Sequence, residues 1–339
     1  MVAAAQKRQV HGEITMTNPD ARKVLITGAG GMLGTDLVTV LNPHFEVGGL
    51  EKRPVVHLCV PYDICDLTQP RKTRDAILSH RPHVVIHTAA LTDVDYCEDH
   101  HDEAEELNVG ATKNVVDVCN ELDIPVIFFS TDYVFDGSKK EPYTETDVPC
   151  PINFYGQTKL DAERYILAHA QRAIIFRITW LYGVWGRSFP KAILRQAAEL
   201  KTLSVVNDQV GRPTYTWDVA QSLLTVLRDK RECVEARSRE IFNLGNEGTV
   251  HWADFARFIL KSENLNGIKV KDIPTSQLKR PAPRPLNSVL SLDKAREVLG
   301  LQLRPWDEAV KEFLPRWKEV KEVEEQKAKA QAAEKENIA

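Results

Sequence analysis

Short apolar runs alternate with stretches of helical periodicity through the first half of this chain. Runs with apolar side chains on successive positions are typical of strands that are buried on both faces. A strand, helix, strand order repeated in this way predicts an α/β fold with a doubly wound parallel sheet. The predicted strands are 23–28, 45–51, 83–90, 125–132, 173–180 and 241–246, and the predicted helices are 33–41, 69–80, 103–122 and 156–170.

A glycine-rich segment, ITGAGGMLG, lies between the first predicted strand and the first predicted helix. Glycines at this position permit a tight turn, close approach of the backbone to a pyrophosphate and close helix packing, while the helix amino end attracts negative charge. The spacing is GxxGxxG rather than GxGxxG, but its place after the first strand favours a dinucleotide cradle over a plain structural turn. We therefore predict a Rossmann-type fold with cofactor contacts from Gly28, Gly31, Met32, Leu33 and Gly34.

The residues after the second predicted strand bear on the choice of cofactor. Glu51 would accept hydrogen bonds from the ribose hydroxyls of NAD, whereas Lys52 and Arg53 would neutralise the extra phosphate of NADP. The alternative is that the two cations merely face solvent. The pattern favours NADPH, with NADH also usable.

Two further strand ends complete the predicted cofactor site. Asp63 and Ile64, in YDICDL, end a short strand where a carboxylate would take the adenine amino group and an apolar side chain would cover its ring. Ala89 and Ala90, in HTAA, are small and leave space for the backbone of the cofactor.

A threonine, a tyrosine and a lysine carry the predicted chemistry, in STDYVFDG and YGQTK. Thr131 ends a predicted strand, at the edge where open parallel sheets bind ligands, and Tyr155 and Lys159 share one face of the next helix. Reducing a ketone requires hydride on carbon and a proton on oxygen, and a phenol with a pKa of about 10 donates well only if its anion is stabilised. We predict that Tyr155 donates the proton, that Lys159 stabilises the phenolate and holds the nicotinamide ribose, and that Thr131 holds the carbonyl.

Composition excludes several other classes of protein. With 43% hydrophobic and 27% charged residues the chain is predicted to be globular, and a formal net charge of -4 gives no reason to expect nucleic-acid binding. No apolar run is long enough for a membrane span, and the first twenty residues lack the apolar core of a signal peptide. The six cysteines form no CxxC pair, which fits a reducing cytoplasm better than a disulfide framework or a zinc site. The Cys, His and acidic residues at 97–106 are better explained as the exposed start of a helix than as metal ligands.

The periodicity loosens after residue 180, which suggests a second, smaller unit. We predict a dinucleotide-binding domain over 21–179 and 215–244, with an interleaved C-terminal substrate lobe over 180–214 and 245–315. Residues 1–20 are predicted to be a flexible lead. Residues 316–339 are rich in Glu, Lys and Ala without a sustained apolar stripe, which predicts a charged helical or disordered tail rather than a coiled coil.

The chain resembles the extended short-chain dehydrogenase/reductase superfamily and, within it, the dTDP-4-dehydrorhamnose reductase family, from about Lys23 to Leu314. The glycine loop and the Tyr155/Lys159 pair mark the superfamily. The segments that mark the family are AALTDVDYCE, LNVGATKNV, STDYVFDG, FRITWLYG, NDQVGRPTYTWDVA and RPLNSVLS, in that order. The resemblance implies NADPH- or NADH-dependent reduction of the 4-keto group of dTDP-4-dehydro-β-L-rhamnose to dTDP-L-rhamnose. It also brings Mg²⁺ and a homodimer as expectations, although the sequence offers no dedicated cluster of metal ligands.

The same resemblance implies a set of substrate contacts. Trp180 would form an apolar wall for the deoxysugar, or alternatively an aromatic plug between the lobes, and Tyr96 departs from the small or basic residue of the family pattern. Either arginine of the set would suit a diphosphate, because its fork meets phosphate oxygens in pairs, and a structural salt bridge is the alternative. The implied contacts are Val94 and Asp95 for the sugar, Gln209 and Arg212 for the nucleotide, and Arg284 with Asn287 for the diphosphate.

Two other functions stay open on the sequence. The regulatory β subunit of methionine adenosyltransferase resembles the same family, binds NADP and retains the tyrosine and lysine, so this chain would then be a partner-binding protein. Thr131 and the DQVGRPT stretch favour the enzyme. Another nucleotide-sugar reductase or an epimerase is the third hypothesis, and an epimerase would keep its nicotinamide tightly bound through purification.

Overall fold

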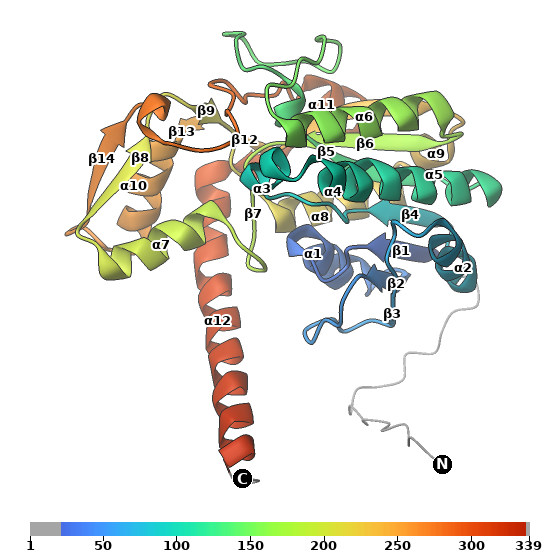
Figure 1. Ribbon diagram of the computed structural model, residues 1–339, viewed down its shortest axis with the longest axis horizontal. Helices are drawn as coiled ribbons and strands as arrows, with labels where there is room; N and C mark the ends of the chain where they lie inside the picture. The colour runs from blue at the N-terminus through green and yellow to red at the C-terminus, as the bar shows by residue number, and fades with distance from the viewer. Residues whose placement is uncertain (1–21, 337–339) are drawn as a thin grey trace.

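The computed structural model describes residues 22–336, which are built around a seven-stranded parallel sheet (Figure 1). All neighbouring strands of this sheet are parallel. The six predicted strands are confirmed, with the short strand at Tyr62–Ile64 at one edge. From edge to edge the strands are β11 (Arg239–Leu244), β6 (Ala173–Ile178), β5 (Val126–Thr131), β4 (Val84–His87), β1 (Lys23–Thr27), β2 (Glu46–Glu51) and β3 (Tyr62–Ile64).

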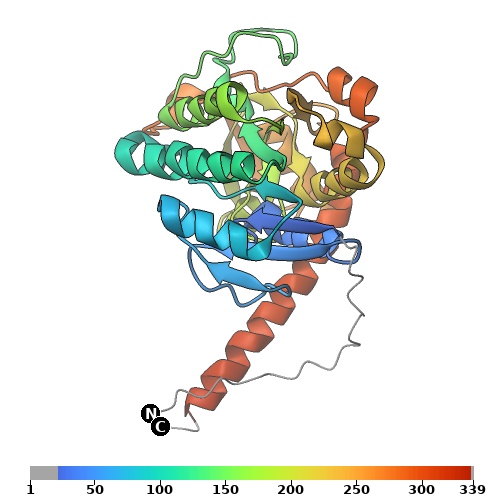
Figure 2. The ribbon, with the colours of Figure 1, turned by 90° about the vertical axis from the view of Figure 1, so that its right-hand side faces the viewer.

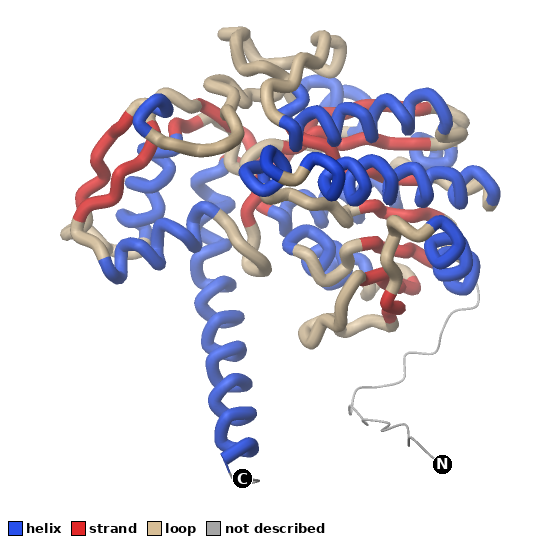
Figure 3. Tube along the Cα trace, viewed as in Figure 1, coloured by secondary structure: helices blue, strands red, loops and turns tan. Residues whose placement is uncertain are grey.

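Helices cover both faces of the sheet, as the views from two sides and the secondary-structure colouring show (Figure 2, Figure 3). Successive strand side chains point to opposite faces, so Val24 and Ile26 enter one core and Leu25 enters the other. The core of Val24 is closed by α1 (Met32–Leu41), α8 (Thr216–Asp229), α9 (Arg231–Glu235) and α11 (Asp293–Leu299). The core of Leu25 is closed by α2 (Pro70–His80), α5 (Ala111–Glu121) and α6 (Phe154–His169). The doubly wound Rossmann-type fold predicted from the sequence is confirmed.

The predicted helix at 103–122 is not continuous. It begins as α4 (His101–Glu105), passes through a π-helical turn at Glu106–Gly110 and resumes as α5. The side chain of Asn108 leaves this turn and makes three hydrogen bonds. It accepts from the backbone N–H of Leu91 at 2.7 Å, and it donates to the carbonyl oxygen of Leu91 and to the hydroxyl of Thr158, each at 3.0 Å. Such turns are frequent near functional sites, and this one ties the loop after β4 to α6.

The strand order places a crevice at the carboxyl ends of the parallel strands. β1 lies between β2 and β4, so the connections that follow β1 and β4 leave toward different sides. In open α/β sheets, ligands bind outside the carboxyl ends of the strands at this reversal of order. The loops after β1, β2, β4 and β5 are therefore the ones that can form a site.

A smaller unit flanks the sheet, on the left of Figure 1. Its core is aromatic, with Tyr182, Tyr215, Phe255 and Phe313 all fully buried. Its helices are α7 (Phe189–Glu199) and α10 (Trp252–Ser262). Its short strand pairs are β8 (Thr202–Val206) with β14 (Lys269–Ile273), β7 (Leu181–Tyr182) with β10 (Thr214–Tyr215), β9 (Val210–Gly211) with β13 (Val250–His251), and β12 (Asn246–Glu247) with β15 (Leu303–Pro305).

The last helix is longer than the sequence analysis predicted. α12 (Trp306–Glu336) begins before residue 316 and extends away from the body of the molecule in both views (Figure 1, Figure 2). Its first turns are docked, because Phe313 is buried and Trp317 packs against the aromatic core of the smaller unit. Arg316 donates a 2.8 Å hydrogen bond to the hydroxyl of Tyr215. The tail thus starts as a packed helix, and residues 337–339 lie outside the described residues.

Two further expectations concern the domain boundaries. The predicted lead, 1–20, lies outside the described residues. α11 was assigned to the substrate lobe, but its Ala295 and Leu299 pack in the core against the sheet. The other boundaries stay predictions. No helix between residues 22 and 336 has the length and apolar character that crossing a membrane requires.

Candidate active site

The glycine loop joins β1 to α1 at the crevice. Gly28 has a φ of 68°, and a Cβ there would lie 2.8 Å from the backbone nitrogen of Ala89. A Cβ on Gly34 would collide with the carbonyl oxygen of Gly28. Both positions therefore require glycine, one for a left-handed turn and one for close packing of α1 on the loop. The amino end of α1 begins at Met32 directly behind this turn, which suits a bound pyrophosphate.

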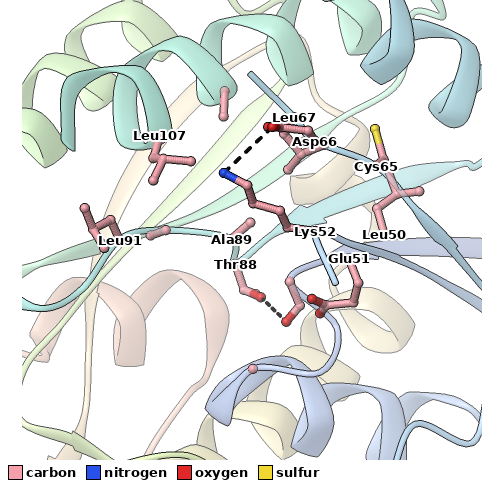
Figure 4. A pocket seen from close by; sticks show the side chains of 14 residues that line it. Leu50, Glu51, Lys52, Cys65, Asp66, Leu67, Thr88, Ala89, Leu91 and Leu107 are labelled. Carbon is pink, nitrogen blue, oxygen red and sulfur yellow. Dashed lines mark hydrogen bonds and ion pairs between the residues drawn. The ribbon is translucent and has the colours of Figure 1, made fainter. Parts of the chain in front are cut away.

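A cavity of about 300 Å³ opens between the glycine loop and the ends of β2 and β4 (Figure 4). Of the residues predicted for the cofactor, its lining includes Gly28, Gly31, Glu51, Lys52, Ala89 and Ala90. We name it the cofactor cavity. Leu91, Leu107 and Ala111 give it an apolar side opposite the glycine loop, and this combination of glycine backbone, acid, cation and apolar wall fits a nicotinamide dinucleotide.

Three charged residues at the end of β2 and just after it, Glu51, Lys52 and Arg53, lie in different places. Glu51 is half-buried and its carboxylate accepts a hydrogen bond from the backbone N–H of Gly30 at 2.5 Å. Burial raises the pKa of Glu51. Lys52 points across the cavity toward Asp66, with 3.7 Å between its Nζ and a carboxylate oxygen (Figure 4). Arg53 is exposed and does not line the cavity.

The predicted adenine contacts, Asp63 and Ile64, do not line the cofactor cavity. Ile64 is 55% exposed, and the carboxylate of Asp63 lies 3.1 Å from Nε2 of His80, outside the cavity. The lining residues are Asp66 and Leu67 instead. The chain continues past the end of β3 before it reaches the cavity, so the carboxylate and apolar pair that faces it comes two residues after the strand.

A second cavity of about 440 Å³ adjoins the first, and Gly31, Thr88 and Ala90 line both. It lies between the sheet edge and the smaller unit, because residues of α1, β5, α6 and α10 all line it. We name it the substrate cavity. The three residues predicted to be catalytic are among its lining: Thr131, Tyr155 and Lys159.

Local structure fixes the position of Tyr155. Asn153 caps α6, since its side chain accepts a 2.8 Å hydrogen bond from the backbone N–H of Gly156. A Cβ on Gly156 would collide with the carbonyl oxygen of Tyr133, so the start of α6 lies directly against the turn that follows β5. The ring of Tyr133 meets the ring of Tyr155 edge-on, with 6.0 Å between the centroids. The phenol is thereby held in the substrate cavity, whose lining also includes Thr131.

The electrostatics of the phenol differ from the prediction. Burial, with the nearby carboxylate of Asp132, raises the pKa of Tyr155 well above its ordinary value, and the hydrogen bond with Thr131 opposes this only in part. Lys159, which was expected to lower this pKa, is not among the groups that shift it. The ring is enclosed, so desolvation of a phenolate is the dominant effect. Tyr155 is therefore held in its protonated form, and the raised pKa makes it a weaker acid than a free phenol unless a cation stabilises the phenolate.

Lys159 is also buried, with 3% of the residue exposed. Its Nζ lies 3.9 Å from the centroid of the Phe128 ring, which offers a cation–π contact. Burial lowers the pKa of Lys159 to about 7, and the charge of Glu163, one turn further along α6, opposes that shift. Glu163 itself forms a buried two-point ion pair with Arg177, at 2.9 and 2.6 Å.

The substrate contacts implied by resemblance divide into two groups. Val94 and Trp180 line the substrate cavity. The others do not: Asp95, Gln209, Arg212, Arg284 and Asn287.

The residues of the second group are engaged in structural contacts. Arg284 forms a 2.9 Å ion pair with Asp95, as the salt-bridge alternative had it. Arg212 donates to the carbonyl oxygen of Leu290 at 2.9 Å, and Asn287 donates to that of Lys139 at 2.7 Å. Buried carbonyl groups of irregular loops need such partners, which explains polar side chains at these positions without a ligand.

Sequence reasoning missed several residues that line the cavities. Arg187 lies between β7 and α7, and Trp252 begins α10; both line the substrate cavity beside Tyr133. The only signals for them were a lone arginine in a loop and a lone tryptophan at the start of a helix, which no spacing connects to the glycine loop. Asp66 and Leu67 stood in the segment already singled out, three residues further on.

Among residues 22–323, whose side chains are described, no three His, Cys, Asp or Glu side chains gather as a possible metal site. The structure thus gives no support to the Mg²⁺ that the resemblance brought.

Comparisons with known proteins agree with this geometry. The family model described as RmlD substrate binding domain matches residues 22–319. A dTDP-4-dehydrorhamnose reductase of Aggregatibacter actinomycetemcomitans is 35% identical over 301 residues, which are 85% of this chain and 97% of the relative. The crystal structure of a dTDP-4-dehydrorhamnose reductase from Clostridium acetobutylicum has a TM-score of 0.79 at 34% identity and covers 87% of this chain and 99% of its own. That of Bacillus anthracis, in complex with NADP, has a TM-score of 0.78 at 30% identity, with 87% and 99% covered.

Proposed function

Since this chain belongs to the RmlD substrate binding domain family, whose matching relatives are dTDP-4-dehydrorhamnose reductases, we propose that it reduces the 4-keto group of dTDP-4-dehydro-β-L-rhamnose to give dTDP-L-rhamnose. It is an NAD(P)-dependent oxidoreductase that acts on a nucleotide sugar. The observation that carries the proposal is the joining of two cavities: the glycine loop lines one, and Thr131, Tyr155 and Lys159 line the other.

The proposed chemistry assigns one task to each of the three side chains. Bound NADPH or NADH supplies the hydride that the carbonyl carbon receives. Tyr155 gives its phenolic proton to the carbonyl oxygen, so the ketone becomes an alcohol and the phenol becomes a phenolate. Thr131, at the end of β5, holds the carbonyl oxygen beside that phenol. Lys159 stabilises the phenolate by its positive charge until solvent returns the proton, and it holds the nicotinamide ribose.

The diphosphate of the substrate needs a cation at the rim of the substrate cavity. Arg187 is exposed there, and apart from Lys159 it is the one lysine or arginine in the lining as the structure describes it. We assign it to the diphosphate in place of Arg284, whose guanidinium is already paired with Asp95. Trp180 and Val94 offer the apolar surface that suits the methyl group of a 6-deoxysugar.

A turnover assay tests the proposed function. The purified protein is expected to oxidise NADPH when dTDP-4-dehydrorhamnose is added, measured by the loss of NADPH absorbance, and to release dTDP-L-rhamnose. UDP- and dTDP-linked 4-keto sugars of other stereochemistry are the controls, and slower turnover is expected with them. If the protein binds NADP but turns over no 4-keto sugar nucleotide, the reductase is excluded, and co-purification with a methionine adenosyltransferase would then favour the regulatory role.

NADPH is proposed as the preferred cofactor, because Lys52 lines the cofactor cavity. Replacing Lys52 by alanine is expected to lower the ratio of kcat/KM for NADPH to that for NADH about five- to tenfold, as expected for one partly exposed charge contact. Arg53→Ala is the matched comparison, and a smaller change is expected because Arg53 is outside the cavity. A larger change in Arg53→Ala than in Lys52→Ala would move the phosphate contact to Arg53.

We propose a reducing compartment as the setting of this enzyme. All six cysteines are free, at positions 59, 65, 97, 119, 150 and 233, which supports a reducing compartment such as the cytoplasm. A homodimer stays a prediction from the resemblance.

A further inference from the structure

Two tryptophans form a stacked pair on one wall of the substrate cavity. The rings of Trp180 and Trp252 lie 3.5 Å apart between centroids with an angle of 11° between their planes, and both line the cavity. Trp180 follows β6 in the sheet domain, whereas Trp252 begins α10 in the smaller unit. The shape of this wall therefore depends on how the smaller unit holds the indole of Trp252 against that of Trp180.

Local backbone preferences do not explain the position of Trp180. Its backbone has a φ of 47°, the left-handed region that a bulky residue adopts only when its surroundings enforce it. The ring lies directly against Gly211, where a Cβ would collide with it. Gly211 makes room for the indole, and the stacked ring of Trp252 fixes it there.

Trp252 is in turn held by a chain of three hydrogen bonds. Its Nε1–H donates to Oε1 of Gln209 at 3.1 Å, and Nε2 of Gln209 donates to the hydroxyl of Thr275 at 3.0 Å. The hydroxyl of Thr275 donates to Asp208 at 2.6 Å. Gln209 is 6% exposed, so both ends of its amide are satisfied by these partners away from bulk water.

We propose that Gln209 is a positioning residue: by holding the indole of Trp252 it fixes Trp180 as the wall that the deoxysugar contacts, and so sets the KM for the sugar nucleotide. The inference rests on the proposed function, because it takes the ligand of this cavity to be a 4-keto deoxysugar nucleotide. It also gives Gln209 a task other than direct contact with the nucleotide. Through the same series of hydrogen bonds, Thr275 also affects the KM for the sugar nucleotide, although it lines neither cavity.

The test compares variants at two residues of this series of hydrogen bonds, Gln209 and Thr275. Gln209→Leu keeps a side chain of similar size but neither hydrogen bond, and it is expected to raise the KM for dTDP-4-dehydrorhamnose about tenfold, with kcat within about twofold and an unchanged Kd for NADPH. Thr275→Val is expected to act in the same direction more weakly, and Thr275→Ser, which keeps the hydroxyl, to restore the KM. Near-ultraviolet circular dichroism should show a weaker tryptophan signal in Gln209→Leu and Thr275→Val, because the stack loosens. Thr225→Val on α8 is the matched control.

The outcomes separate this inference from the proposed function. An unchanged KM and an unchanged tryptophan signal in both Gln209→Leu and Thr275→Val would overturn the inference even if the wild type turns over. An equal rise in the KM for the sugar and the Kd for NADPH would overturn it too, because it would indicate general loosening. If Gln209→Leu does not fold, the Thr275 pair decides alone. If the wild type turns over no 4-keto sugar, the proposed function and the sugar assignment both fail, and the tryptophan signal still decides whether Gln209 positions the stack.

Discussion

Replacing Tyr155 by phenylalanine is expected to reduce the turnover of dTDP-4-dehydrorhamnose about a thousandfold, because the substitution removes the proposed proton donor. The ring remains, so its edge-on contact with Tyr133 and the start of α6 should be kept. The high pKa of Tyr155 means that the phenol carries its proton at neutral pH, and phenylalanine has none to give. The Kd for NADPH is expected to stay within about threefold of the wild type, since a lost neutral hydrogen bond has only a modest effect.

The measurement is steady-state NADPH oxidation, together with fluorescence titration of NADPH. Tyr165→Phe is the matched control: it removes a phenol from the same helix, where the hydroxyl donates to exposed Asp117 at 2.6 Å, and activity near that of the wild type is expected. Equal rates in the wild type and Tyr155→Phe would show that the assigned proton donor is wrong. A loss of NADPH binding in Tyr155→Phe would instead place the hydroxyl in the cofactor site.

Lys159→Met is expected to change activity and stability in opposite directions. Turnover should fall at least a hundredfold, because no cation remains to stabilise the phenolate. The free energy of unfolding should rise, by up to about 3 kcal/mol near pH 7, because methionine has a similar length and no charge to desolvate. The wild type keeps a buried ammonium group over Phe128 at the expense of stability, which is a common feature of active sites.

The sign of the pH dependence follows from the lowered pKa of Lys159. Burial moves this pKa from 10.5 to about 7, so the folded protein binds fewer protons than the unfolded chain between these two values. The buried lysine lowers the free energy of unfolding of the wild type by its full amount below about pH 7, and this loss disappears as the pH rises toward 10.5. The stability gained by Lys159→Met should follow the same course.

Urea unfolding at several pH values checks this expectation. Lys72→Met serves as control, because Lys72 is exposed on α2 and its removal should change stability little at any pH. A Lys159→Met variant that is less stable than the wild type at neutral pH would contradict the buried, destabilising cation. A gain in stability that does not shrink at high pH would assign the effect to packing rather than to charge.

The fold, the glycine turn and the shared helix face of Tyr155 and Lys159 were predictable because the signals for each lie within a few residues of one another. The apolar runs at 83–90 and 125–132 reflect strands buried on both faces, and the nearly continuous apolar character of each run is enough to predict that burial. The glycine loop is recognised because turn, strand end and helix start are adjacent in the chain. Tyr155 and Lys159 share a helix face because four residues make about one turn.

The surroundings of the site were less predictable, because they depend on residues far apart in the sequence. Asp63 and Asp66 are both acids near the end of β3, and only the path of the chain after the strand shows that Asp66 lines the cavity. The isolated Arg284 suggests a diphosphate ligand, whereas in the fold it pairs with Asp95, which lies 189 positions away in the sequence.

The sequence by itself determined the succession of strands and helices along the chain, the glycine turn after β1 and the place of Tyr155 and Lys159 on one helix face, since each of these follows from local spacing and backbone stereochemistry. The tertiary structure alone decided the wall formed by Trp180 and Trp252, the engagement of Gln209, and the pKa values of Tyr155 and Lys159. The physical reason is that burial and hydrogen-bond partners come from segments brought together by folding, and a side chain's chemistry depends on those neighbours as much as on its own type.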